Sequence, residues 1–164
     1  MRLGDSVIRY SKGKMTHTNF SFDIPENYDL ELQPECGAGY SLLIFHSPDD
    51  KIIIEINVSH IEGSARDCFE EVMADEFIPH KIIRDYAEVK RGKGTALSLC
   101  YGAAGNWCPT YREIYTFEKN KYGENCVDIQ VYLFSRKKKK IDMTILEALE
   151  VPDIKTFLNS IEYY

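Results

Sequence analysis

The sequence lacks the features that mark several large classes of protein. It has no apolar run long enough to span a membrane, and no apolar stretch of signal-peptide length follows Met1. Its 20 basic residues are outnumbered by 26 acidic ones, and a net charge of −6 repels phosphate backbones. These absences predict a cytoplasmic protein that has no membrane span and binds no nucleic acid.

Closely spaced metal ligands are also lacking. The five cysteines are an odd number with no Cys-x-x-Cys pair, which argues against a disulfide framework and a zinc knuckle. The four histidines each stand alone beside predicted strand ends or turns. We therefore expect reduced thiols, no metal and no cofactor. The residues concerned are Cys36, Cys68, Cys100, Cys108, Cys126, His17, His46, His60 and His80.

The composition that is present is that of an ordinary globular protein. With 164 residues, 44% of them hydrophobic and 28% charged, the chain is long enough to bury about 70% of its unfolded surface without disulfide bonds or structural metal ions. This predicts a single domain over residues 1–164. Residues 1–17 are expected to form an N-terminal hairpin extension, because the turn-like Ser11-Lys12-Gly13-Lys14 separates two short strand-like segments.

Alternation of apolar and polar residues predicts seven further strands. Their connectors are short and rich in turn residues, so successive strands are most simply antiparallel neighbours. The predicted strands are Asn19 to Ile24, Ser41 to Phe45, Lys51 to Val58, Ile82 to Lys90, Thr95 to Tyr101, Thr110 to Glu118 and Cys126 to Phe134.

Two segments have helical periodicity instead. The first begins at Ser64, placed to cap the first turn, and carries an apolar stripe that includes Phe69 and Val72 before Pro79 ends it. The second begins near Pro152 and has Phe157 and its neighbours on one stripe. The pattern predicts an α+β domain, a mainly antiparallel β-sheet flanked by helices.

The order of these elements, the opening Phe20-Ser21-Phe22-Asp23-Ile24-Pro25-Glu26-Asn27-Tyr28 and the ending Phe157-Leu158-Asn159-Ser160-Ile161 together resemble the PsbP-like superfamily. The resemblance covers about residues 18–164. It implies an α/β/α sandwich, the fold shared by photosystem II extrinsic proteins, a Ran-binding nuclear import factor and bacterial effector chaperones. It carries over no functional residue, because that superfamily shares no catalytic motif.

The most unusual segment is the predicted loop over residues 102–109, which holds the only tryptophan. Asn106, Trp107 and Cys108 lie there between Tyr101 and Tyr111. Loops on a rigid sheet often carry binding functions, and tryptophan supplies a large contact area, so these five residues are the predicted binding patch. The alternative is a plain hairpin connection whose Trp107 folds back onto the sheet.

Two other features have modest interpretations. Cys100 and Cys108 bracket the loop but have no adjacent cation, helix start or histidine in the sequence to activate a thiolate. The basic run Arg136 to Lys140 is expected to be a solvated turn, and contact with an anionic partner is the alternative.

Two functions stay open on the sequence alone. The first is a non-catalytic cytoplasmic protein-binding module, an adaptor or an effector chaperone, that holds a protein partner with its sheet face and loop aromatics. The second is a small-molecule-binding protein or enzyme. Its pocket would lie between sheet and helix and be lined by Tyr101, Tyr111, Tyr115 or Tyr132. The sequence predicts no oligomeric state.

Overall fold

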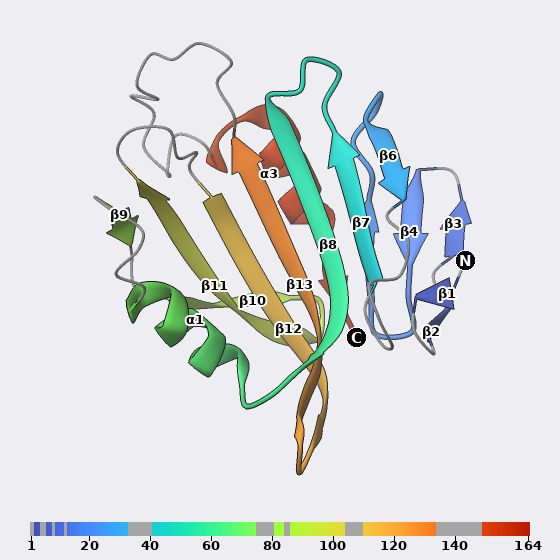
Figure 1. Ribbon diagram of the computed structural model, residues 1–164. Coiled ribbons are helices and arrows are strands. Elements are labelled where there is room, and N and C mark those ends of the chain that lie inside the picture. Colours follow the sequence, from blue (N-terminus) through green and yellow to red (C-terminus); the bar gives the residue numbers. More distant parts are fainter. Residues whose placement is uncertain are drawn as a thin grey trace.

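The computed structural model describes residues 2–3, 6–7, 9–11, 13–32, 41–74, 81–83, 86–103, 110–133 and 149–164. In this part of the chain, two antiparallel sheets and two helices make up the body of the protein (Figure 1). A further strand pair, β1 (Arg2–Leu3) with β2 (Ser6–Val7), lies at the N-terminal end. The protein is therefore mainly antiparallel β, as the sequence predicts.

The large sheet has eight strands in the order β10-β11-β12-β13-β8-β7-β6, and β9 pairs with β11 beside β10. Its bounds are β6 Asp29–Leu32, β7 Ser41–His46, β8 Ile52–Ile61, β9 Lys81–Ile83, β10 Ala87–Arg91, β11 Gly94–Ala103, β12 Thr110–Asn120 and β13 Gly123–Leu133. The predicted strand pair around residues 47–51 and the run of antiparallel neighbours from β10 to β13 are confirmed.

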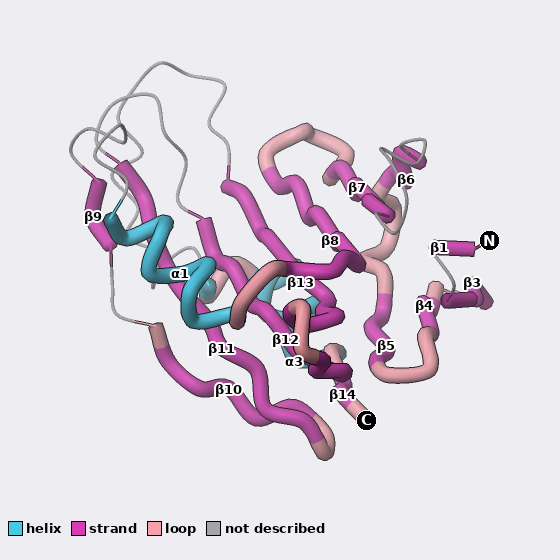
Figure 2. The backbone as a smooth tube through the Cα atoms, turned by 60° about the horizontal axis from the view of Figure 1, so that its bottom comes forward, coloured by secondary structure: helices cyan, strands magenta, loops and turns pink. Residues whose placement is uncertain are grey.

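The central pairing of the large sheet joins strands that are distant in the sequence. β13 lies antiparallel to β8, from Glu124 opposite Ile61 to Leu133 opposite Ile52. The chain leaves the sheet after β8, passes through the first helix, and returns as β9 at the edge of the sheet beside β11 (Figure 2).

The small sheet has the order β14-β5-β4-β3. Its bounds are β3 Arg9–Ser11, β4 Lys14–Thr16, β5 Phe20–Asp23 and β14 Glu162–Tyr163. β3 and β4 pair as an antiparallel hairpin within the predicted N-terminal segment, with Gly13 in the left-handed region at φ 76° in its turn. It is an integral part of a sheet here, since β14 arrives from the other end of the chain to pair with β5.

One strand prediction is wrong in detail. The segment Ile82 to Lys90 forms two short strands, β9 and β10, that pair with different parts of β11. β6 and β14 were not predicted, because two to four residues are too few to show a periodicity of two.

Helix α1 (Ala65–Ala74) begins where the sequence places it. Ser64 Oγ accepts a hydrogen bond from the Asp67 amide at 3.3 Å, and Asp67 Oδ2 accepts one from the Ser64 amide at 2.8 Å. This reciprocal pair satisfies free donors of the first turn. Glu124 on β13 also accepts from the Ala65 amide at 3.3 Å and so seats the helix on the sheet.

The two helices pack on opposite faces of the large sheet. Phe69 of α1 packs on Leu99, Ile114 and Cys126, and we call this side the α1 face. Helix α3 (Pro152–Ser160) packs with the small sheet on the other side, which we call the α3 face. The main core on the α3 face includes Phe22, Phe45, Ile54, Ile56, Val127, Ile129, Ile154 and Phe157. Neither described helix is long and apolar enough to cross a membrane.

Candidate functional site

Strand β12 carries an arginine and a glutamate side by side, and each belongs to a different polar cluster. Because successive strand residues point to opposite faces, Arg112 lies on the α1 face and Glu113 on the α3 face. We call the group of Arg91, Tyr111, Glu113 and Tyr163 the closed cluster. The group of Glu55, Asn57, Arg112, Asp128, Gln130 and Tyr132 is the open cluster.

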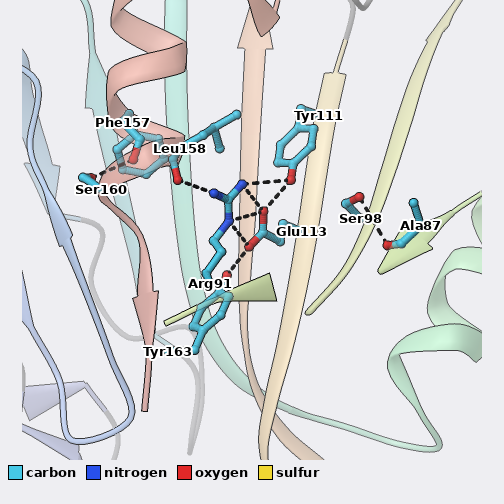
Figure 3. Close-up of polar contacts among 9 residues, drawn as sticks. All are labelled: Ala87, Arg91, Ser98, Tyr111, Glu113, Phe157, Leu158, Ser160 and Tyr163. Atoms are coloured by element: carbon cyan, nitrogen blue, oxygen red, sulfur yellow. Dashed lines mark hydrogen bonds and ion pairs between the residues drawn. The ribbon is translucent and has the colours of Figure 1, made fainter. Parts of the chain in front are cut away.

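The closed cluster is centred on Glu113, whose side chain is fully buried. Arg91 Nε donates to both carboxylate oxygens, at 2.8 and 3.0 Å, and Tyr163 Oη donates to Oε1 at 2.6 Å (Figure 3). Tyr111 Oη donates to Oε2, and Arg91 Nη1 donates to the carbonyl oxygen of Leu158. The Glu113 carboxylate thus joins β10, β12 and β14, and Arg91 adds α3 through the Leu158 carbonyl.

Protonation in the closed cluster is fixed by burial. Burial raises the pKa of both Tyr111 and Tyr163, and the charge of Glu113 raises each further, so both hydroxyls stay protonated donors. Burial alone would lower the pKa of Arg91, but its hydrogen bonds and proximity to Glu113 outweigh that effect and raise it. Both carboxylate oxygens of Glu113 accept hydrogen bonds, so the cluster holds the C-terminal segment on the sheet.

The open cluster spans three neighbouring strands of the α1 face. Glu55 on β8 lies opposite Gln130 on β13, and Gln130 lies opposite Arg112 on β12. Asp128 and Tyr132 flank Gln130 on the same side of β13. The cluster is therefore a row of polar side chains across the middle of the sheet.

Arg112 and Asp128 form the ionic part of the open cluster. Arg112 Nε donates to Asp128 Oδ1 at 3.0 Å and Nη2 donates to Oδ2 at 2.7 Å, and the guanidinium lies 5.7 Å from the Phe69 ring centroid. Burial lowers the pKa of Arg112, but Asp128 outweighs it and the pKa is raised. The pair is a fixed bidentate contact beneath α1.

Tyr132 links the rest of the row. Its hydroxyl lies 2.7 Å from Gln130 Oε1 and 3.1 Å from Glu55 Oε2, while Gln130 Nε2 donates to Asp128 at 3.4 Å. Burial raises the pKa of Tyr132 and the Glu55 charge raises it further, so the hydroxyl keeps its proton. Glu55, Gln130 and Tyr132 are only half-buried, unlike Glu113.

The structure divides the predicted site residues between two faces. Tyr111 is 8% exposed and belongs to the closed cluster, whereas Tyr101 packs beside the core under α1. The structure therefore does not bring these two tyrosines together on one face, because neighbouring residue pairs of β11 and β12 point to opposite sides of the sheet. Asn106, Trp107 and Cys108 lie outside the described residues.

The four tyrosines named for a pocket are divided in the same way. Tyr115 stacks on Tyr163 at 4.0 Å on the α3 face beside Tyr111, and Tyr132 lies with Tyr101 on the α1 face. A single pocket therefore cannot use all four.

Two of the described cysteines, Cys68 and Cys126, have thiols that stay protonated. Burial raises the pKa of Cys68 and raises that of Cys126 to about 12, and both lie under or on α1. Cys100 is half-buried and packs against the main core on the α3 face. In the same part of the chain, no three histidine, cysteine or acidic side chains converge as metal ligands do. The basic run Arg136 to Lys140 lies outside the described residues.

The open cluster was not predicted as a site, although the sequence carries its signal. Polar residues occupy alternate positions of two strands that are otherwise strongly apolar: Glu55 and Asn57 between isoleucines and a valine, and Asp128 and Gln130 between valines and an isoleucine. Such a mixed second face indicates that one side of the sheet is not entirely core.

No family model and no curated protein match this sequence. A crystal structure of a protein from Bacteroides thetaiotaomicron VPI-5482 aligns with 99% of this chain and 49% of its own length, at 15% identity and a TM-score of 0.43. The chain thus spans about half the length of that protein. A likeness this distant assigns neither family nor function, so function has to be argued from the site.

Proposed function

We propose that this chain is a non-catalytic protein-binding module and that its partner docks on the α1 face over β8 and β13. The observation that carries the proposal is the open cluster, a row of half-buried polar side chains on the middle strands of a rigid sheet. Half-buried polar groups flanked by apolar side chains such as Ile53 are typical of protein interfaces.

The chemistry of the described residues supports binding over catalysis. Cys68 and Cys126 have raised thiol pKa values, and a nucleophilic cysteine needs a lowered one. The tyrosines of both clusters are likewise held protonated. The helices on opposite faces support the α/β/α sandwich that the resemblance to the PsbP-like superfamily implies, and its adaptor and chaperone members bind proteins.

A cross-linked pull-down from the native host tests the proposal. Ile53→Trp adds bulk without charge in the docking face, and Trp107→Ala tests the loop between β11 and β12. Glu88→Gln on the exposed side of edge strand β10 is the matched control. A partner that is captured by the wild type and the control but lost from folded Ile53→Trp supports docking on the α1 face. Retention of that partner by Ile53→Trp contradicts it, and loss from Trp107→Ala alone would move the docking site to the loop.

A further inference from the structure

Around Tyr132 the open cluster has more hydrogen-bond acceptors than the tyrosine hydroxyl can satisfy. Tyr132 has one hydroxyl proton, yet two acceptors lie within hydrogen-bond distance of it, Gln130 Oε1 and Glu55 Oε2. The Gln130 amide is oriented by its donation to Asp128, so its oxygen faces Tyr132. At any moment one of the two acceptors lacks this donor.

A third acceptor lies on the same strand. Asn57 Oδ1 is buried and has no hydrogen-bond partner among the described residues. Asn57 and Glu55 are alternate residues of β8, so both point to the α1 face at a spacing of about 7 Å. A buried acceptor without a donor costs about 1–3 kcal/mol, so turning the partly buried Asn57 amide toward a ligand that donates to its oxygen recovers that cost.

No cation among the described residues balances the charge of Glu55. Arg112 is neutralised by its bidentate pairing with Asp128, and Glu55 forms no ion pair with any described residue. The same row continues across β7 to Glu31 on β6, whose side chain is 57% exposed and whose carboxylate lies 3.3 Å from the His46 ring. The row is therefore acidic, in a chain whose net charge is −6.

We infer that the partner segment is cationic and places an arginine side chain against Glu55, with its guanidinium donating to the Glu55 carboxylate and to the Gln130 or Asn57 oxygen. This inference rests on the proposed function, of which it specifies the partner. A planar guanidinium has five donors and suits several fixed acceptors at once, whereas an ammonium acts as a compact point charge. Charge complementarity then sets the orientation of the bound segment.

Peptide titration followed by amide NMR of the full chain tests the inference. The probe is a blocked Ser-Gly-Arg-Gly-Ser pentapeptide, compared with the same peptide carrying lysine, citrulline or glutamate in place of arginine. Glu55→Gln removes the acceptor charge, and Glu88→Gln removes an equal charge from the far edge of the sheet. Asn57→Val removes the second acceptor without changing the net charge.

We expect the arginine peptide to shift amides of β8 and β13, with Kd weakened at least about tenfold by Glu55→Gln and less than about twofold by Glu88→Gln. Asn57→Val should also weaken binding, which keeps the test valid if Glu55→Gln fails to fold. Equal effects of the two glutamate variants, equal binding of the citrulline peptide, or absence of binding would overturn the inference. Equal binding of the lysine peptide would overturn the choice of guanidinium.

The two proposals fail differently. If no peptide binds but Ile53→Trp still releases a captured partner, the cationic segment is wrong and docking on the α1 face stands. If the arginine peptide binds at Glu55 but Ile53→Trp retains the partner, the acidic row is a cation site that the protein partner does not use.

Discussion

The two clusters on either side of β12 use the same kinds of residue to different ends. On the α3 face, Glu113 receives donors from one arginine and two tyrosines and is fully buried. On the α1 face, one tyrosine proton is shared by Glu55 and Gln130, and Asn57 Oδ1 has no described partner. A complete network stabilises the fold, whereas an incomplete, half-buried one is a candidate for binding.

The largest expected effect is that of removing the centre of the closed cluster. Glu113→Ala leaves Arg91 and two tyrosine hydroxyls buried without their acceptor, and we expect the free energy of unfolding to fall by about 3–5 kcal/mol. Urea denaturation measures this loss. Glu88→Ala, an exposed residue on β10, should change stability by less than about 0.5 kcal/mol. If the two variants lose the same stability, the cluster does not hold the C-terminal segment.

A matched pair of hydroxyl deletions compares the clusters directly. Tyr163→Phe removes a donor to a buried carboxylate and should cost about 1.5–3 kcal/mol. Tyr132→Phe removes a donor from the half-buried row, where water can replace it, and should cost about 1 kcal/mol or less. Thermal and urea unfolding measure both values. The contrast between the clusters disappears if Tyr132→Phe is as costly as Tyr163→Phe.

Asn57→Val should make the protein slightly more stable. The substitution removes a buried acceptor that has no described partner and places a β-branched residue in a strand, so we expect a gain of about 0.5–1 kcal/mol. A gain in stability together with weaker binding of the arginine peptide would show a functional site maintained at the expense of stability. Clear destabilisation by Asn57→Val would mean that its oxygen is satisfied in solution.

The smallest expected effect is the pH dependence of stability that His17, between β4 and β5, contributes. His17 is 6% exposed, stacks on Phe20 at 4.5 Å, and has its pKa lowered by burial from 6.5. Below that pH the unfolded chain binds a proton that the folded protein resists, so the free energy of unfolding should decrease as pH falls through this range. His17→Phe should flatten the dependence between about pH 7 and 5, measured by urea midpoints. An unchanged slope would show that other groups control it.

The strands and helices were predictable because each depends on a local sequence pattern. Alternation in β8 places Ile52, Ile54 and Ile56 on the buried α3 face, as observed, and Ser64 begins α1 through the predicted cap. The polar second faces of β8 and β13 were visible too. The open cluster that these faces form together could not be predicted, because the sequence does not show that Glu55 lies opposite Gln130.

The sequence by itself determined the antiparallel strands, the two helices and which side chains share a face, since periodicity depends only on neighbouring residues. The tertiary structure decided that β8 pairs with β13 and that β14 closes the small sheet on β5. It also decided that Arg91 and Tyr163 converge on Glu113, from positions that resemble ordinary surface residues in the sequence. Contacts between distant residues follow from how the whole core packs, and local periodicity does not carry that information.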